Sequence, residues 1–149
     1  MSTTVSPLKI TDKQQWQDLF LAYGEFYGMP MDQTTLDNVW DWIFDEGKPF
    51  YAFLAKDQSG QAVGFMHYRA MPSPLRGKEV GFLDDLFVNP NCRGGGVVEA
   101  LFAALKDEAT HHGWPFVRWM TADNNYRGRN VYDKIAQKTP WLTYQMAVD

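Results

Sequence analysis

Cysteine is nearly absent from this sequence of 149 residues, in which Cys92 is the single one. One cysteine excludes a disulfide within the chain and any zinc site built from several thiolates. The sequence also lacks an apolar run near the roughly 20 residues that a membrane-spanning helix needs. Asp12 and Lys13 interrupt the pattern of a secretory signal. We therefore expect a cytoplasmic protein without a membrane partner.

Positive charge is in deficit, because 14 Lys and Arg face 18 Asp and Glu, for a formal net charge of −4. This balance argues against a general nucleic-acid binder, and we expect no nucleic-acid partner. Aromatic residues are plentiful at 15% of the chain, which excludes the composition of a disordered protein. The length suits one domain with its own core, and no linker or repeat is visible. We expect a single domain over residues 1–149.

Apolar residues of the first third recur at intervals of three and four, which is the period of a helix. This pattern predicts a helix over 16–27 that ends at Gly28, and a second helix over 36–44. Thr11 and Gln14 have the spacing of a capping box at the start of the first helix.

The period then changes to that of strands. The pattern predicts a hairpin of strands 50–56 and 63–69, joined by a turn at 57–60. A segment with two prolines and a glycine, 71–78, is expected to be a loop, and 82–88 a strong strand.

The last third alternates between helix and strand patterns. We expect a helix over 97–112, a strand over 116–121, a short helix capped by Asp123 that runs to about Lys138, and a last strand over 141–148. Early strands joined by hairpins and later strands joined through helices predict a mixed sheet with helices on both faces. The fold class is α/β (α+β), and a doubly wound dinucleotide fold is disfavoured.

The most informative segment is 82–98, which reads as a strand, a tight loop and the start of a helix. Three consecutive glycines, 94–96, leave backbone N–H groups uncovered, and the helix N-terminus adds its partial positive charge. Arg93 adds a permanent cation. Together these features indicate a phosphate or pyrophosphate site, whereas the plainer alternative is a connecting turn. The P-loop pattern fails, because Val97 and Val98 stand where it needs Lys and a hydroxyl residue.

In this segment the chain resembles the GNAT family of acetyl-CoA-dependent N-acetyltransferases. Arg93, Gly96 and Val98 occupy the positions of the family's loop motif, and Leu86–Pro90 matches its fourth strand. Asn125 and Tyr132 stand seven residues apart, as the family's pantetheine-contacting Asn and general-acid Tyr do.

The segments 118–121 and 130–134 are similar to the branch that contains yeast histone and polyamine acetyltransferases and bacterial relatives. The resemblance covers 52–148 and implies a central sheet of six to seven strands with about four helices.

The resemblance also implies a reaction and its residues. Acetyl-CoA is the expected co-substrate, no metal is expected, and the acceptor is a small-molecule or peptide amine. Tyr132 is the expected acid for the thiolate, and Asp84 and Asp85 are the expected catalytic carboxylates, with Asp84 as the base. Tyr27, Asp84 and Asp85 are the expected substrate contacts. The expected cofactor-binding residues are Leu86, Phe87, Val88, Arg93, Gly94, Gly95, Gly96, Val97, Val98 and Asn125. A homodimer is expected by analogy with relatives.

The orientation of the two aspartates is open at the level of sequence. Adjacent strand residues point to opposite faces, so only one of Asp84 and Asp85 is expected to face the site. A β-bulge changes that count, and such bulges occur beside active sites. The alternative is that one of the two caps a loop or pairs with an arginine. His67 is expected to be structural, or else to line the acceptor channel.

Two departures from the family pattern support a second hypothesis. Val98 replaces a small residue where a backbone should approach pyrophosphate, and Gly128 replaces an alanine inside the last helix. They favour a non-catalytic acyl-CoA-binding or sensor domain as the alternative function. A flavin or nucleotide binder is a third, disfavoured by the hairpins of the first half.

Overall fold

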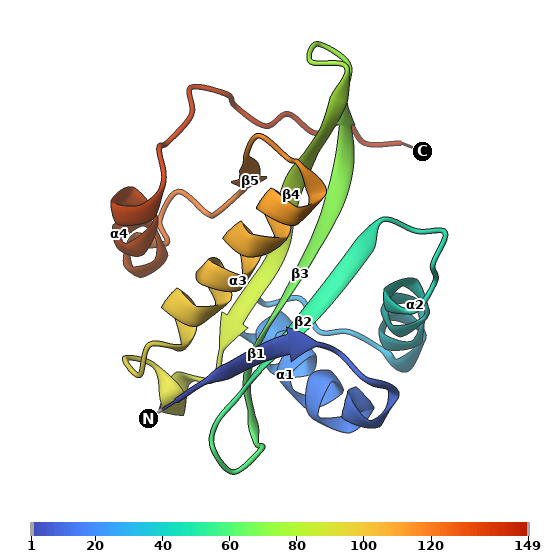
Figure 1. Cartoon of the computed structure of the whole chain (residues 1–149), viewed down its shortest axis with the longest axis vertical. Helices are drawn as coiled ribbons and strands as arrows, with labels where there is room; N and C mark the ends of the chain where they lie inside the picture. Colours follow the sequence, from blue (N-terminus) through green and yellow to red (C-terminus); the bar gives the residue numbers. More distant parts are fainter. Residues whose placement is uncertain (1, 149) are drawn as a thin grey trace. The chain divides into compact units, whose positions relative to one another are not determined.

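The computed structural model describes residues 2–148 of the chain. Among them, five strands form one sheet in the order β1-β2-β3-β4-β5, antiparallel except for the parallel pair β4 and β5 (Figure 1). The mixed α/β sheet is confirmed, although its strand count is below the six to seven expected. The strands are β1 (Thr4–Pro7), β2 (Phe50–Lys56), β3 (Ala62–Ser73), β4 (Lys78–Val88) and β5 (Val117–Trp119).

Four α-helices are present in the described part of the chain, close to where the periodicity predicts them. They are α1 (Lys13–Phe26), α2 (Gln33–Ile43), α3 (Val97–His112) and α4 (Tyr126–Ile135), with short 3-10 turns η1 (Ile10–Asp12) and η2 (Pro90–Cys92). The chain divides into two compact units, one up to Trp119 and one from Met120 onward, and each is described by itself. No helix in residues 2–148 has the length and apolarity to cross a membrane.

Both faces of the sheet in the first unit carry a core, because successive strand residues point to opposite sides. The helices α1 and α2 cover one face and α3 covers the other, as Figure 1 shows. The α1 face includes Trp16, Phe20, Trp40, Leu54, Phe65 and Phe87. The α3 face includes Met66, Tyr68, Leu83, Leu101, Leu105 and Trp114.

The expected loop over 71–78 is wrong, because both strands of the hairpin continue into it. β3 runs to Ser73 and β4 begins at Lys78, with Met71 opposite Val80 in the register. The turn between them is short, and Gly77 adopts the positive φ of 64° that it needs. The prolines are compatible with the edge of a hairpin, since each lacks only its own N–H.

The expected strand over 141–148 is also wrong, since residues 136–148 form neither helix nor strand. A strand exists only when a neighbour accepts and donates its backbone hydrogen bonds. An alternating apolar pattern indicates that the segment favours an extended conformation, but it does not show that another strand is available for pairing. None of the described strands pairs with this segment.

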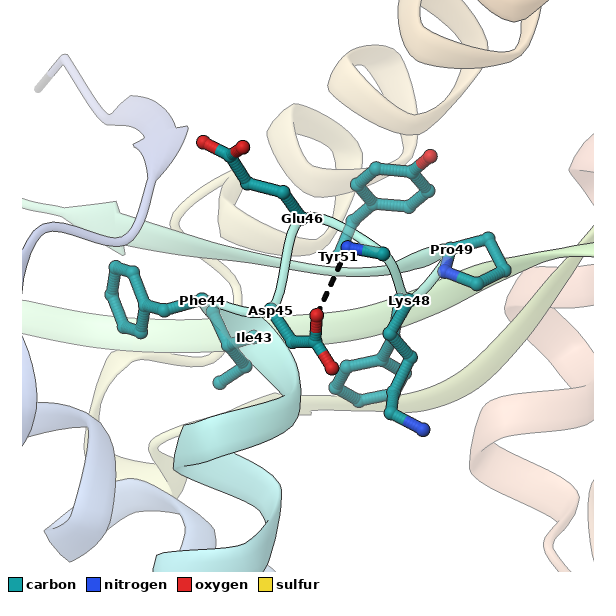
Figure 2. Close-up of a pocket in the computed structure, with 9 residues that line it drawn as sticks. Ile43, Phe44, Asp45, Glu46, Lys48, Pro49 and Tyr51 are labelled. Atoms are coloured by element: carbon teal, nitrogen blue, oxygen red, sulfur yellow. Dashed lines mark hydrogen bonds between the residues drawn. The ribbon is translucent and has the colours of Figure 1, made fainter.

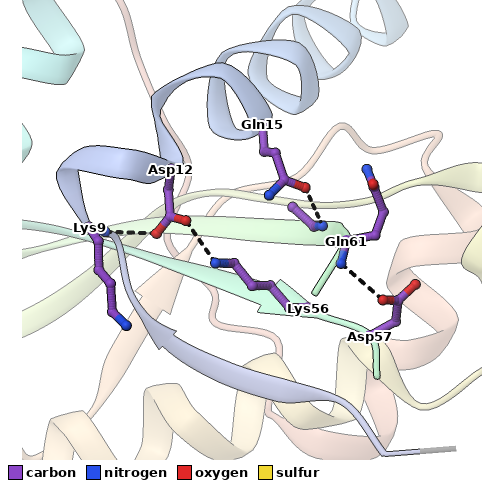
Figure 3. Close-up of polar contacts among 7 residues, drawn as sticks. Lys9, Asp12, Gln15, Lys56, Asp57 and Gln61 are labelled. Atoms are coloured by element: carbon purple, nitrogen blue, oxygen red, sulfur yellow. Dashed lines mark hydrogen bonds and ion pairs between the residues drawn. The ribbon is translucent and has the colours of Figure 1, made fainter. Parts of the chain in front are cut away.

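A buried carboxylate, and not the expected capping box of Thr11 and Gln14, organises the start of α1 (Figure 3). Asp12 accepts a hydrogen bond of 2.8 Å from the backbone N–H of Lys9 and one of 2.7 Å from Nζ of Lys56. Its side chain is 7% exposed. The helix start is therefore tied to β2 by a charged pair.

We expect the substitution Asp12→Asn to remove about 2 kcal/mol of stability at pH 7, or about 4 to 8 °C in Tm. Burial alone raises the pKa of Asp12, but the hydrogen bonds and charges of Lys56 and Lys9 outweigh burial and lower it. A lowered pKa means that this stability exists above the ordinary pKa and is lost as the pH falls through the folded one.

Urea unfolding at pH 7 and in acid measures this effect, with Asp107→Asn, an exposed carboxylate of α3, as the control. The difference in unfolding free energy between Asp12→Asn and the parent protein should become smaller in acid. A difference that stays constant with pH contradicts a charge-dependent contribution.

Candidate functional site

The glycine loop between β4 and α3 has the backbone of an anion cradle. Gly94 and Gly96 adopt positive φ values of 85° and 82°. A Cβ at either position would meet nothing within 4 Å, so the backbone conformation itself is what favours glycine there. Gly96 is the N-cap of α3, and the first N–H groups of that helix have no acceptor inside it. Donors and partial positive charge therefore collect at this loop.

The residues on either side of the glycines are partly fixed by packing. The guanidinium carbon of Arg93 lies 5.5 Å from the ring centroid of Phe26, which is at the end of α1. Val97 is buried, and Val98 is half-buried against the core of the α3 face. The branched side chain of Val98 thus has a packing role. Packing is therefore a reason for valine at this position that does not require a degenerate binding site.

The edge of β4 is open next to this loop. β5 pairs only with Gly81–Leu83, so among the described residues 86–88 have no strand partner on that side. Val88 and Phe87 are buried, and the ring centroid of Phe87 lies 5.9 Å from that of Tyr23. Tyr27 is half-exposed, with its ring centroid 4.9 Å from that of Tyr23. The end of α1 and the open edge of β4 therefore adjoin one another.

A β-bulge at Asp84 settles the orientation of the two aspartates. His67 is opposite Asp85, and the next residue, Tyr68, is opposite Leu83, so Asp84 is the extra residue of β4. Asp85 contacts His67, and Asp84 contacts Arg69, two residues further along β3. His67 and Arg69 point to the same face by strand alternation. The bulge therefore brings both carboxylates to the α1 face of the sheet.

The two carboxylates have different partners. Oδ2 of Asp85 lies 2.9 Å from Nδ1 of His67. Oδ2 of Asp84 forms an ion pair of 3.1 Å with Nε of Arg69 but no aligned hydrogen bond. The Arg69 guanidinium also lies 4.8 Å from the ring centroid of Phe82. Both side chains remain about a quarter exposed, at 26% for Asp84 and 24% for Asp85.

The surroundings of Asp84 raise its pKa. Burial raises the pKa of Asp84 above its ordinary value, the Arg69 guanidinium lowers it in part, and the neighbouring Asp85 charge raises it again. The net direction is upward. A carboxylate with a raised pKa accepts a proton more readily at neutral pH.

Asn125 and Tyr132 belong to the second unit, which is described by itself. Asn125 is the N-cap of α4, where the sequence predicts Asp123 instead. Its Oδ1 accepts from the N–H of Gly128 at 3.2 Å, and its Nδ2 donates to Oγ1 of Thr121 at 2.9 Å. Tyr132 follows by seven residues, nearly two helical turns, and thus shares a side of α4 with Asn125.

Gly128 has a structural reason in this cap. A Cβ at Gly128 would lie 2.6 Å from Nδ2 of Asn125, too close for that side chain to stay in place. The glycine makes room for the cap and does not indicate a loosened helix. The cap therefore gives Gly128 a reason that does not require a degenerate site.

A pocket lies away from the glycine loop, in the connection between α2 and β2 (Figure 2). It is lined by residues 43–51, where Asp45 accepts a hydrogen bond of 2.9 Å from the N–H of Gly47. This pocket was not predicted, although an acidic pair followed by Gly47 and Pro49 between two elements marks a structured loop. The structural expectation for His67 and the alternative of an aspartate paired with an arginine agree with the structure, in which His67 contacts Asp85 and Arg69 pairs with Asp84. The sequence did not identify these partners, because they depend on the register of the β3–β4 hairpin.

Comparisons with known sequences agree with this architecture. The sequence model of the Acetyltransferase (GNAT) family matches residues 14–136. D-amino-acid N-acetyltransferase HPA3 of Saccharomyces cerevisiae is 28% identical over 142 residues, which cover 95% of this chain and 88% of that protein. Uncharacterized N-acetyltransferase YhfO of Bacillus subtilis is 26% identical over 126 residues, 85% of this chain and 83% of that one.

Solved structures share the fold. The ribosomal-protein-alanine N-acetyltransferase from Brucella melitensis biovar Abortus 2308 has a TM-score of 0.82 at 22% identity, covering 99% of this chain and 100% of that one. AAC(6')-Iy in complex with the bisubstrate analog CoA-S-monomethyl-acetylneamine has a TM-score of 0.82 at 19% identity, covering 100% of both chains. The likeness in fold agrees with the family match. The chain belongs to the acetyltransferase (GNAT) family and is an acetyl-CoA-dependent N-acetyltransferase.

Proposed function

We propose that this enzyme transfers the acetyl group of acetyl-CoA to the primary amine of a small cationic acceptor, an amino acid or a lysine side chain. The observation that carries the proposal is the bulge, which directs Asp84 and Asp85 to one face beside the open edge of β4. Two carboxylates on one face suit an acceptor that arrives as an ammonium ion. Relatives point the same way, since HPA3 is named for D-amino acids.

Acetyl-CoA is assigned to the glycine loop and the adjoining strand. The positive φ of Gly94 and Gly96 and the exposed donors of the α3 N-terminus fit a pyrophosphate. Arg93 supplies a permanent cation beside them. The residues proposed to contact acetyl-CoA are Leu86, Phe87, Val88, Arg93, Gly94, Gly95, Gly96, Val97, Val98 and Asn125. Single domain organisation over 1–149, a homodimer and a cytoplasmic location remain predictions.

The proposed reaction is a direct attack. Asp84 accepts a proton from the acceptor's ammonium group, directly or through a water molecule, and the amine nitrogen then bonds to the thioester carbonyl carbon. A backbone N–H near Phe87 or Val88 stabilises the oxyanion. The carbon–sulfur bond breaks and Tyr132 protonates the thiolate. The nitrogen releases its second proton to water, and Tyr132 regains a proton from water. Asp85 and Tyr27 contact the acceptor.

The cradle is tested by Gly96→Ala, with Gly60→Ala as a matched control. Gly60 lies in the β2–β3 turn and has a φ of 86°, close to the 82° of Gly96, and open space around a Cβ. Each substitution should therefore cost a similar amount, about 1 kcal/mol, in the protein alone. Acetyl-CoA at about 100 times its Kd should raise the Tm of the parent by about 5 to 10 °C.

We expect Gly60→Ala to keep the full shift and Gly96→Ala to lose most of it. Thermal melts with and without acetyl-CoA, followed by mass spectrometry of an amine panel, measure both parts. Equal shifts in the two variants contradict the assigned cradle. Binding without acetylation of any amine contradicts the proposed acceptor class.

A further inference from the structure

His67 is a completely buried polar ring in the middle of the α1 face. Its exposed fraction is 0%, and ring centroids of Phe20 and Phe65 each lie 4.8 Å away. Such a ring must satisfy both nitrogens with protein partners. Nε2 lies 2.9 Å from Nε1 of Trp16, and Nδ1 lies 2.9 Å from Oδ2 of Asp85. His67 therefore bridges α1 to one of the two aspartates.

The chemistry of the indole fixes the tautomer of His67. An indole N–H can only donate, so Nε2 of His67 accepts and carries no hydrogen. The single ring hydrogen is therefore on Nδ1, where it donates to Asp85. A cationic His67 would direct a second N–H against the indole N–H and lose the bond to Trp16. Trp16 thus favours the tautomer of His67 that carries its hydrogen on Nδ1.

This arrangement fixes what Asp85 can do. Its Oδ2 accepts the hydrogen bond from Nδ1–H of His67, which holds the carboxylate in one orientation. The charged groups near the pair are Asp84 and Arg69, while the elements packed against His67 contribute aromatic rings. Among the described side chains no Lys or Arg forms an ion pair with Asp85, and its side chain remains partly exposed.

We propose that Trp16 and His67 are positioning residues that hold Asp85 as a fixed anionic anchor for the acceptor's ammonium group, so that Asp84 alone takes the proton. This inference rests on the proposed function and divides its two carboxylates between binding and base catalysis. It predicts that the orientation of Asp85 affects the KM for the amine more than kcat.

Two substitutions of His67 separate the two hydrogen bonds. His67→Asn keeps an amide N–H near the position of Nδ1 and hence the donor to Asp85. His67→Gln keeps an amide oxygen near the position of Nε2 and hence the acceptor for Trp16. Both remove the ring from the same packing site, so both should lower the Tm to a similar extent. We expect the KM for the amine in His67→Asn to stay within about threefold of the parent value. In His67→Gln this KM should rise at least about tenfold.

The tautomer has a readout that needs no activity. The chain has three histidines, so comparing the nitrogen NMR spectrum of the parent with that of His67→Asn assigns the His67 signals. We expect a protonated Nδ1 and an unprotonated Nε2 in the parent. In Trp16→Phe, which removes the indole donor and keeps a ring, the fraction of the tautomer with its hydrogen on Nδ1 should fall.

The outcomes are distinct. A parent protein that binds acetyl-CoA but acetylates no amine refutes the proposed function. An active parent with equal KM values in the Asn and Gln variants refutes the positioning role. A hydrogen on Nε2 of His67 in the parent refutes the tautomer. Should both His67 variants fail to fold, the KM and pH profile of Trp16→Phe decide, since an unchanged KM for the amine then overturns the proposal.

Discussion

Replacing Tyr132 with Phe should lower kcat by about 100-fold or more while acetyl-CoA still binds, because a general acid contributes roughly 10² to 10⁴ in rate. The thiolate would then leave without a proton from the enzyme. Removal of one hydroxyl keeps the ring and its half-buried position on α4. The Tm shift with acetyl-CoA should therefore stay close to that of the parent.

Tyr126→Phe is the matched control, since Tyr126 lies on the same helix and is 74% exposed. We expect this control to keep the parent's kcat. Steady-state kinetics with a saturating amine, together with melts in the presence of acetyl-CoA, provide the measurement. An unchanged kcat in Tyr132→Phe would show that Tyr132 is not the general acid. Loss of acetyl-CoA binding in this variant would indicate that the hydroxyl of Tyr132 contacts acetyl-CoA instead.

Replacing Asp84 with Asn should lower kcat at pH 7 by about 100-fold, because the group that takes the ammonium proton is lost. The activity of the parent should rise with pH as Asp84 ionises, and again toward pH 8 to 9 as more free amine is present, since an unperturbed primary amine has a pKa near about 10. In Asp84→Asn the increase in activity at lower pH, which follows ionisation of Asp84, should disappear. The increase in activity toward pH 8 to 9 should remain.

The substitution Arg69→Gln tests the role of Asp84 by removing the cation next to it. The pKa of Asp84 is raised by burial and partly lowered by the Arg69 guanidinium. Without that cation the pKa of Asp84 should rise further. The increase in activity that follows ionisation of Asp84 should therefore occur at higher pH. Asp107→Asn, far along α3 and exposed, serves as the control. If the increase in activity occurs at the same pH in Arg69→Gln as in the parent, Asp84 is not the ionising group.

The glycine loop and the helices could be predicted from the sequence because their signals are local. The interval of three to four between apolar residues places α1, α2 and α3 within a few residues of their observed bounds. Three consecutive glycines before a helix already indicate donors for an anion, and Gly94 and Gly96 indeed adopt left-handed backbone. The spacing of motifs along the chain was sufficient for the family.

The division of the two aspartates depended on pairing between strands. Alternation by itself directs Asp84 and Asp85 to opposite faces, and only the register with β3 reveals the extra residue. The same register brings His67 against Asp85 and Arg69 against Asp84. The sequence signal for His67 was a lone histidine in a strand, which is ambiguous without its neighbours.

The two errors in the strands have the same origin. Residues 141–148 alternate as a strand would but have no partner in the described part of the chain, and the prolines of 71–78 did not prevent pairing. The helices, the glycine loop and the family were readable from the sequence, because their signals lie in residues close together in the chain. Which strands pair, where the bulge lies and what Asp85 contacts follow only from the three-dimensional structure, because hydrogen bonds between distant segments fix the register.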